Sequence, residues 1–287
     1  MMNTSSSHVN LHSFILTGIP GMPDKNPWMA FPLGFLYTMT LLGNGTILAI
    51  IKVDQSLHEP MYCFLSILAL TDVGLSMSTL PSMLSVFWFN APEVPFDACI
   101  TQMFFIHSFG EVGSGVLVSM AFDRFVAIRH PLHYASILTH GIIGKTGIAV
   151  IIWAVCVVFP VPFLIKRLPF YAMRLACVST RANSLYGLIV VIFTLGFDAL
   201  IILLSERLKA LNTCLSHICA VLLFYVPLIG VTIIHRFRKH LSPVVHTFMT
   251  NTYLLLPPLL NPVVYSVKTK QIRRRIILVF QRQKNRV

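Results

Sequence analysis

Hydrophobic residues along this chain gather in seven long stretches that short polar connections separate. Each stretch has about 20 mainly apolar residues, the length that an α-helix needs to cross a hydrocarbon layer of roughly 30 Å. The pattern predicts an all-α membrane protein, a bundle of seven transmembrane helices. The predicted spans cover residues 31–51, 61–87, 100–128, 142–165, 185–204, 211–234 and 244–267. Because the connections are short, we expect residues 1–287 to form one domain.

The composition supports an integral membrane protein. Hydrophobic residues make up 55 % of the chain and charged residues only 11 %, whereas soluble domains carry about 25 % charged residues. The mean hydropathy is +0.76. The net charge of +12 comes from residues at span edges and in one tail, with no soluble domain to present them to nucleic acid. We therefore expect anionic membrane lipid, and no nucleic acid, as the partner of this charge.

The distribution of basic residues predicts the orientation. With the N-terminus outside, 14 of the 22 Lys and Arg residues fall in inner segments and eight in outer ones. Positive charge favours the cytoplasmic side. Residues 1–26, which lack the features of a signal peptide, are thus predicted as an extracellular tail and residues 268–287 as a basic cytoplasmic tail. We expect a multi-pass protein of the plasma membrane.

The segment after the last span alternates basic and apolar residues from Lys268 to Phe280. This alternation predicts a short amphipathic helix that lies on the inner leaflet. The alternative is a solvated tail that merely stops membrane transfer.

Polar residues inside the spans stand at few positions. Asp123 and Arg124 end the third span, where headgroups and water solvate a charge pair that would be costly at mid-bilayer. Asn44 and Asp72 lie deeper, in the first and second spans. A buried amide or acid needs a hydrogen-bond partner. We expect Asn44 and Asp72 to bond to each other in a polar core; a purely structural pair is the alternative.

Two further motifs concern the outer side. Asn3-Thr4-Ser5 is a glycosylation sequon on the predicted outer tail, so we expect Asn3 to carry a glycan. Cys99 and Cys177 are the two cysteines expected on the oxidising side. The remaining cysteines lie in or at the inner ends of spans, where we expect thiols that only pack.

Several motifs in a fixed order carry a family resemblance. They include Met-Ala-Phe-Asp-Arg-Phe at 120–125, Asn-Pro-Val-Val-Tyr at 261–265, Leu-His-Glu-Pro-Met-Tyr at 57–62, Lys-Ala-Leu-Asn-Thr-Cys at 209–214 and Phe-Tyr-Val-Pro at 224–227. Together they resemble the olfactory branch of the rhodopsin-like seven-helix receptors over nearly the whole chain, in class I and nearest to olfactory receptor family 51. The resemblance implies a receptor for a small-molecule odorant that couples to a heterotrimeric, olfactory-type G protein and raises cyclic AMP.

The resemblance also implies roles for single residues. Ligand binding shifts the population toward a state in which the sixth helix swings outward. Pro227 would supply its hinge, because a proline removes one helical hydrogen bond. Asp123 would hold Arg124 until activation frees it for the G protein. The seventh span would join the same rearrangement through three residues, namely Asn261, Pro262 and Tyr265. The alternative for all of these positions is that they only anchor the helices at the membrane interface.

For the ligand site we expect residues on the outer halves of the third and sixth spans, namely Phe104, His107, Glu111, Thr232 and Arg236. His107 and Glu111 are four residues apart and share a helix face, where they can pair. Arg236 can grip a carboxylate with two hydrogen bonds. Carboxylic acids and other polar odorants are therefore the expected ligands. The alternative is an arginine that only reaches toward the interface.

Two connections are shorter than in the family that the chain resembles. The second outer loop lacks its middle part, so Cys99 either pairs with Cys177 or forms no bridge. Residues 205–209 join the fifth and sixth spans with almost no loop. This joint favours the alternative that the chain is a divergent or truncated receptor that no longer couples. A transporter is a weaker alternative, because we see no inverted repeat. No clustered nucleophile or metal site indicates an enzyme, and no cofactor is expected.

Overall fold

The computed structural model describes residues 13–15, 30–89, 91, 93–160, 162, 208–236 and 243–284. All structural statements below concern these residues. The fifth predicted span, Asn3, Cys177 and the joint at 205–207 lie outside them.

Six of the seven predicted spans are found as helices. They are α1 (Ala30–Val53), α2 (Pro60–Phe87), α3 (Phe96–Arg129), α5 (His140–Val158), α9 (Leu208–Arg236) and α10 (Pro243–Lys268). Of the described helices, α1, α2, α3 and α5 are long and apolar enough to cross a membrane, and α9 holds a shorter apolar stretch, Ile218–Val231. The hydrophobic pattern therefore predicted the positions of these helices correctly.

Local sequence signals set where some helices begin. α2 begins at Pro60, whose missing N–H costs nothing in the first helical turn. The side-chain oxygen of Thr139 caps α5 by accepting a hydrogen bond from the backbone N–H of Ile142 at 3.4 Å. Two short elements, η2 (Gln55–Leu57) and α4 (Tyr134–Ile137), lie in the connections that follow α1 and α3.

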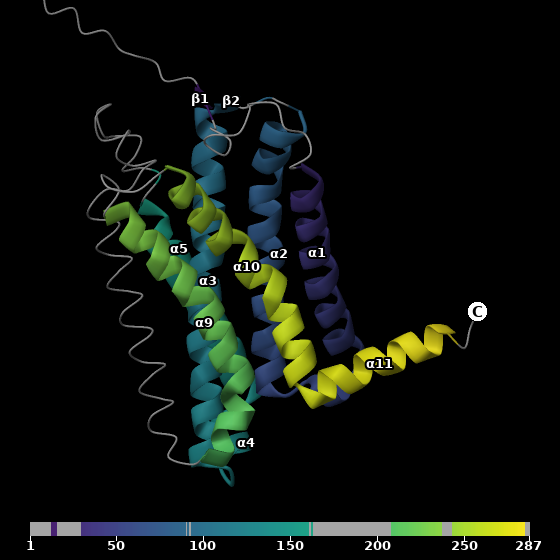
Figure 1. The fold of residues 1–287 in the computed structure, drawn as a ribbon. Coiled ribbons are helices and arrows are strands. Elements are labelled where there is room, and N and C mark those ends of the chain that lie inside the picture. Colours follow the sequence, from purple (N-terminus) through teal and green to yellow (C-terminus); the bar gives the residue numbers. More distant parts are fainter. Residues whose placement is uncertain are drawn as a thin grey trace, which may run out of the picture.

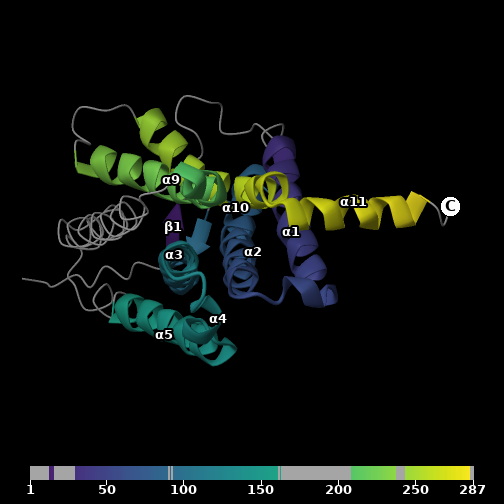
Figure 2. The same cartoon turned by 90° about the horizontal axis from the view of Figure 1, so that it is seen from below.

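The helices form one bundle with α3 at its centre (Figure 1). α3 packs against α2, α5 and α9, while α10 packs against α1, α2 and α9. Viewed along the bundle, α5, α3, α2 and α1 follow one another, and α9 and α10 cover one side of this row (Figure 2).

The basic segment after α10 forms the predicted helix, α11 (Lys270–Lys284). It leaves the end of α10 and runs away from the bundle in both views (Figures 1 and 2). Ile272 in its first turn is fully buried, so the beginning of α11 belongs to the packed core. Its place on the inner leaflet stays a prediction.

A small sheet corrects the prediction of a purely helical protein. β1 (Ser13–Ile15) pairs in antiparallel fashion with β2 (Glu93–Pro95), with Phe14 opposite Val94. This pairing ties a segment of the expected outer tail to the beginning of α3. Strands of three residues are too short to show an alternating pattern, and partners 80 positions apart leave no local signal.

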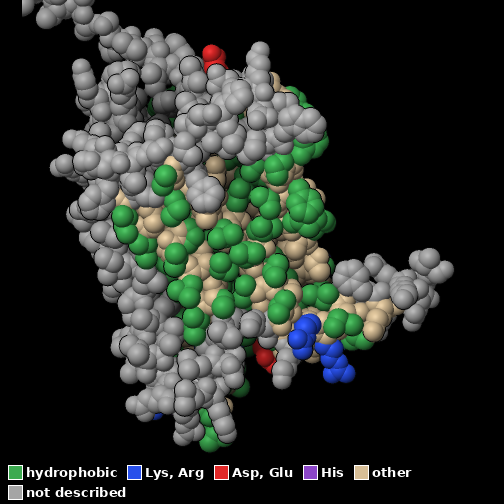
Figure 3. All heavy atoms as spheres, viewed as in Figure 1, with side chains coloured by type: hydrophobic (Ala, Val, Ile, Leu, Met, Phe, Trp, Pro, Cys, Tyr) green, Lys and Arg blue, Asp and Glu red, His purple; other side chains and the backbone are tan. Residues whose placement is uncertain are grey.

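Apolar side chains are buried at one end of the bundle and exposed around it. The core clusters where α1 ends and α2 begins, around Leu57, Leu65, Met120 and Tyr265, each at most 2 % exposed. Apolar side chains cover much of the face seen in Figure 3, and Trp153 on α5 is 60 % exposed. Exposed apolar surface of this extent is what contact with lipid tails requires.

α1 and α10 approach each other closely at Gly43. A Cβ atom at this position would lie 3.0 Å from Cβ and 3.2 Å from Cγ of Pro262. The proline ring cannot rotate away, so the absence of a side chain at Gly43 sets the distance between the two helices.

We expect Gly43→Ala to destabilise the folded protein, because overpacking usually costs about 1–3 kcal/mol. Gly45→Ala is the matched control in the same helix, since a Cβ there meets nothing within 4 Å. The control should be neutral or stabilising, because Ala favours helix over Gly by roughly 1 kcal/mol. Thermal denaturation of the purified variants in detergent measures the difference. Equal melting temperatures for the two variants would contradict the close contact.

Candidate functional site

The polar core of the bundle is built around the prolines of α10. Pro262 has no N–H, so the carbonyl of Pro258, one helical turn earlier, lacks its intrahelical donor. The side-chain Nδ2 of Asn44 on α1 donates a hydrogen bond to this carbonyl at 2.9 Å and another to the carbonyl of Thr40 at 3.0 Å. Asn44 thus satisfies a buried backbone oxygen that the sequence of α10 leaves open.

The expected bond between Asn44 and Asp72 is therefore wrong. Asp72 on α2 accepts a hydrogen bond from Nδ2 of Asn261 on α10 instead, at 2.9 Å between Asn261 Nδ2 and Asp72 Oδ2. Both residues are buried. The two amides thus have separate partners, since Asn44 bonds to the backbone of α10 and Asn261 bonds to the acid. The buried Oδ1 of Asn261 accepts no hydrogen bond from the described residues, which leaves it open to water or a small cation.

The end of α3 carries the charged pair. Asp123 is fully buried, and its Oδ2 accepts a hydrogen bond from Nε of Arg124 at 2.7 Å as well as one from Nη2. Sequence reasoning missed a second partner, Tyr134 in α4, whose hydroxyl donates to Asp123 Oδ1 at 2.7 Å. Burial raises the pKa of Tyr134, with a further contribution from the Asp123 bond, so the hydroxyl stays protonated and able to donate.

Two tyrosines connect α3 to its neighbours. Tyr265 on α10 is fully buried, and its hydroxyl lies 3.9 Å from the sulfur of Met120 on α3. Tyr225, two residues before Pro227 in α9, shares a hydrogen bond of 2.9 Å with Ser114. The predicted positions 227, 261, 262 and 265 therefore all lie on helices that contact α3 or one another. The sequence indicated Tyr265 and Met120 through their motifs without indicating that they meet, and it gave no sign of Ser114, which looks like an ordinary helix residue.

The outer half of α3 brings together only part of the expected ligand site. Glu111 is half-buried and follows Gly110, where an added Cβ would lie 3.2 Å from the hydroxyl of Tyr253 on α10. The Tyr253 ring meets Phe224 of α9 edge to face, with 6.0 Å between ring centroids. Sequence reasoning did not single out Tyr253 as a neighbour of this part of α3, because a lone tyrosine in an apolar helix looks like packing.

His107 and Phe104 lie nearer the beginning of α3. The His107 side chain is exposed, and among the described residues it forms no ion pair with Glu111, so the expected pairing is not found. The Phe104 ring packs edge to face on Phe105 at 5.6 Å. Thr232 and Arg236 lie in the last turns of α9, but their side chains are outside the described part. Cys99 stands in the first turn of α3, and a bridge to Cys177 stays a prediction.

Known proteins are similar to this chain over nearly its whole length. A family model described as olfactory receptor matches residues 33–283. Human olfactory receptor 51H1 is 69 % identical in an alignment that covers 95 % of this chain and all of that receptor. Human olfactory receptors 51G2 and 51L1 are each 50 % identical, over 97 % and 93 % of this chain and 98 % and 94 % of their own lengths.

These alignments are longer than the part of this chain that they contain. The alignment with 51H1 spans 302 positions, whereas 95 % of 287 residues is only about 273 residues. About 30 positions of the alignment, the difference between 302 and 273, therefore have no counterpart in this chain. That the missing positions fall in the connecting loops stays a prediction.

The Tyr134 hydrogen bond predicts the effect of removing one hydroxyl. Tyr134→Phe should lower the free energy of unfolding by about 1.5–2 kcal/mol, the lower part of the range for a bond to a charged group, because Tyr134 is only half-buried. A double-mutant cycle with Asp123→Ala, which removes the acceptor oxygens, isolates the contact. If Tyr134→Phe costs as much in the Asp123→Ala background as in the native one, the hydroxyl does not act through Asp123.

Proposed function

The chain belongs to the olfactory receptor family, and on that basis we propose how it detects odorants and passes the signal across the plasma membrane. Its family makes it a multi-pass G-protein-coupled receptor and not an enzyme. In our proposal, residues 1–287 form one receptor domain with the N-terminus outside and the C-terminus in the cytoplasm. A small odorant binds between the outer halves of the helices, and an olfactory-type heterotrimeric G protein binds at the inner end.

The observation that carries the coupling mechanism is the environment of Asp123. Its carboxylate is fully buried and receives hydrogen bonds from Arg124 and Tyr134, so the guanidinium is held against α3 in this state. Release of Arg124 would present a positive charge at the inner end of the bundle. Because Tyr134 stands in the connection after α3, a partner that displaces α4 also removes one of the bonds that stabilise the carboxylate.

The link between the ligand and this pair runs through α9 and α10. Pro227 lets the two halves of α9 move differently, and the Tyr225–Ser114 bond joins α9 to α3 beside it. Asn261 and Tyr265 connect α10 to α2 and α3. A ligand that favours another arrangement of α9 or α10 shifts the population between the two states by its difference in affinity for them.

The ligand site we propose lies between α3, α9 and α10. Glu111 and Tyr253 supply polar groups on the inner walls, Phe104 and His107 lie toward the outer end of α3, and Thr232 and Arg236 end α9. The Arg236 guanidinium suits a carboxylate, while the Glu111 carboxylate repels one. We therefore propose polar odorants as ligands. Carboxylic acids are the most informative of them, because Arg236 and Glu111 act on a carboxylate in opposite directions.

Two modifications belong to the same proposal. We place a glycan on Asn3 in the outer tail and a disulfide bridge between Cys99 and Cys177, the two cysteines on the oxidising side.

A second candidate function is a receptor that binds ligand but couples weakly. It is favoured by the missing positions in the alignment with 51H1 and by the short joint between the fifth and sixth spans. The sixth span begins as α9 at Leu208. With the fifth span predicted to end at residue 204, three residues, 205–207, remain, and they reach at most about 11 Å when fully extended. Such a joint restrains outward motion of the inner end of α9.

The opposed charges predict how the ligand site discriminates. Arg236→Ala should weaken the response to a carboxylic acid far more than the response to its neutral ester, by roughly the 1.5–3 kcal/mol of a charge-assisted hydrogen bond. Glu111→Gln should strengthen the response to the acid, because it removes a like charge. Concentration–response curves from a cyclic AMP reporter, with a surface-label control, measure both. Equal losses for acid and ester in Arg236→Ala would reject its role.

The short joint predicts weak coupling in the native chain. Inserting a helical extension and loop of the length found in the relatives after Ser205 should raise ligand-driven cyclic AMP, because α9 gains freedom to move. An insert of equal length without helix-forming residues is the control for added slack alone. A native chain that already signals as strongly as the extended one would show that the joint does not limit coupling, and would favour the first candidate function.

A further inference from the structure

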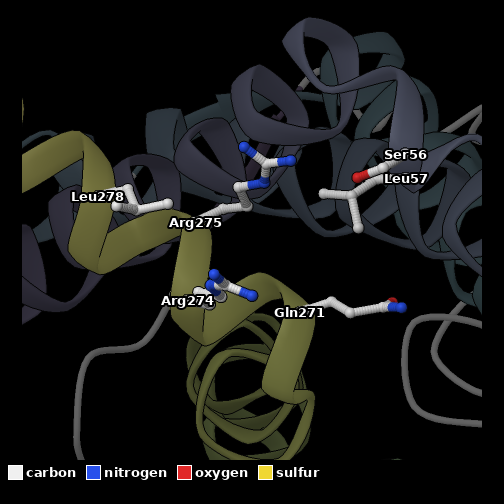
Figure 4. Close-up of a pocket in the computed structure, with 6 residues that line it drawn as sticks. All are labelled: Ser56, Leu57, Gln271, Arg274, Arg275 and Leu278. Atoms are coloured by element: carbon white, nitrogen blue, oxygen red, sulfur yellow. The ribbon is translucent and has the colours of Figure 1, made fainter.

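A cavity of about 270 Å³ lies between the connection after α1 and the beginning of α11. Ser56 and Leu57 of η2 form one wall, and the residues of α11 that form the other are Gln271, Arg274, Arg275 and Leu278. Figure 4 shows the two arginine side chains and the Gln271 amide on the α11 side, facing the segment that carries Ser56 and Leu57. None of these residues takes part in the ligand site or in the coupling mechanism proposed above.

The walls of the cavity are fixed by contacts outside it. Arg275 forms an ion pair with Asp54, and Asp54 Oδ1 also accepts hydrogen bonds from Ser56 Oγ at 2.8 Å and from the Ser56 backbone N–H at 3.1 Å. The Ser56 side-chain bond in particular lowers the pKa of Asp54, so this acid stays ionised. The Tyr62 hydroxyl donates to Gln271 Oε1, and Ile272 is fully buried. These contacts therefore fix the beginning of α11, and with it one wall of the cavity, against the bundle.

The charge of the cavity is positive. Asp54 compensates Arg275, but among the described residues no carboxylate pairs with Arg274. α11 contains no acidic residue, and blue side chains gather where α11 leaves the bundle in Figure 3. An anion that enters the cavity thus meets one uncompensated guanidinium, with the amide N–H groups of Gln271 beside it.

We propose that this cavity binds the phosphate headgroup of an anionic membrane lipid, with a phosphomonoester of the phosphoinositide class as its ligand. Arg274 is the principal contact, because a guanidinium binds phosphate through two parallel hydrogen bonds. Leu278 provides an apolar edge for the rest of the lipid. The volume lies just below the range of about 300–1,000 Å³ typical for drug-sized ligands, which fits a headgroup.

Lipid is favoured over a soluble anion by the position of the site. The exposed faces of α11 carry arginines beside Ile277 and Leu278, the composition of a helix that lies at the level of lipid headgroups. The inference rests on the proposed topology, which puts α11 at the inner leaflet. It needs neither an odorant nor a G protein.

The test is lipid binding to the full-length purified receptor in detergent, measured by native mass spectrometry with dioctanoyl phosphatidylinositol bisphosphate. Arg274→Gln should raise the dissociation constant about tenfold or more, the loss expected for a charge-assisted bond. Arg273→Gln is the matched control, because this substitution removes the same charge from the same helix. Arg273 is exposed and does not line the cavity. It should change the dissociation constant less than about threefold.

Further measurements distinguish a specific binding site from a merely charged surface. Arg274→Lys keeps the charge but loses the planar guanidinium, so its loss of binding should lie between those of Arg273→Gln and Arg274→Gln. Because it keeps the charge, this variant also controls for folding. Equal losses in Arg273→Gln and Arg274→Gln, or unchanged binding in Arg274→Lys, would overturn the proposal in favour of a diffuse basic surface. Inositol trisphosphate or inorganic phosphate that binds as tightly as the lipid would overturn the assignment to lipid and point to a soluble phosphate.

Discussion

The bundle depends on one hydrogen bond, from the Asn44 side chain to the carbonyl of Pro258. Pro262 cannot donate to that carbonyl, and a buried acceptor without a partner costs about 1–3 kcal/mol. The lipid phase offers no donor, so a neighbouring part of the bundle supplies it. α1 does so at 2.9 Å, and this is possible because the neighbouring Gly43 lets the α1 backbone approach the Pro262 ring. The irregularity of α10 thus determines how α1 packs.

Once Asn44 bonds to the backbone, the acid of the core needs a different partner. Asn261 fills that role for Asp72 at 2.9 Å, immediately before the proline that created the open carbonyl. One turn further on, Tyr265 contacts Met120 of α3, three residues before Asp123. Any change in the bend of α10 at its prolines therefore moves groups bonded to α1, α2 and α3 at once. This coupling of contacts would suit the proposed switch between two arrangements better than gradual bending.

The sequence predicted the helices well because lipid demands long apolar stretches, whereas contacts between helices leave weaker signals. It showed that Asn44 needs a partner but named the wrong one; the spacing of four residues between Pro258 and Pro262 was the available clue. Tyr134 and Tyr253 were missed because an isolated tyrosine has no pattern that separates a polar contact from packing. The β1–β2 pair was missed because its strands have three residues and lie far apart in the chain.

Several contacts connect the cavity beside α11 to the same core. Asp54 and Tyr62, which hold Arg275 and Gln271, flank the connection between α1 and α2, and these are the helices that bind α10 through Asn44 and Asp72. α11 itself follows α10 after a single residue, Thr269. A phosphate bound to Arg274 would therefore stabilise the end of α10 in its present position against α1 and α2. A lipid that prefers this arrangement opposes any ligand that prefers another, by the difference in its affinity for the two states.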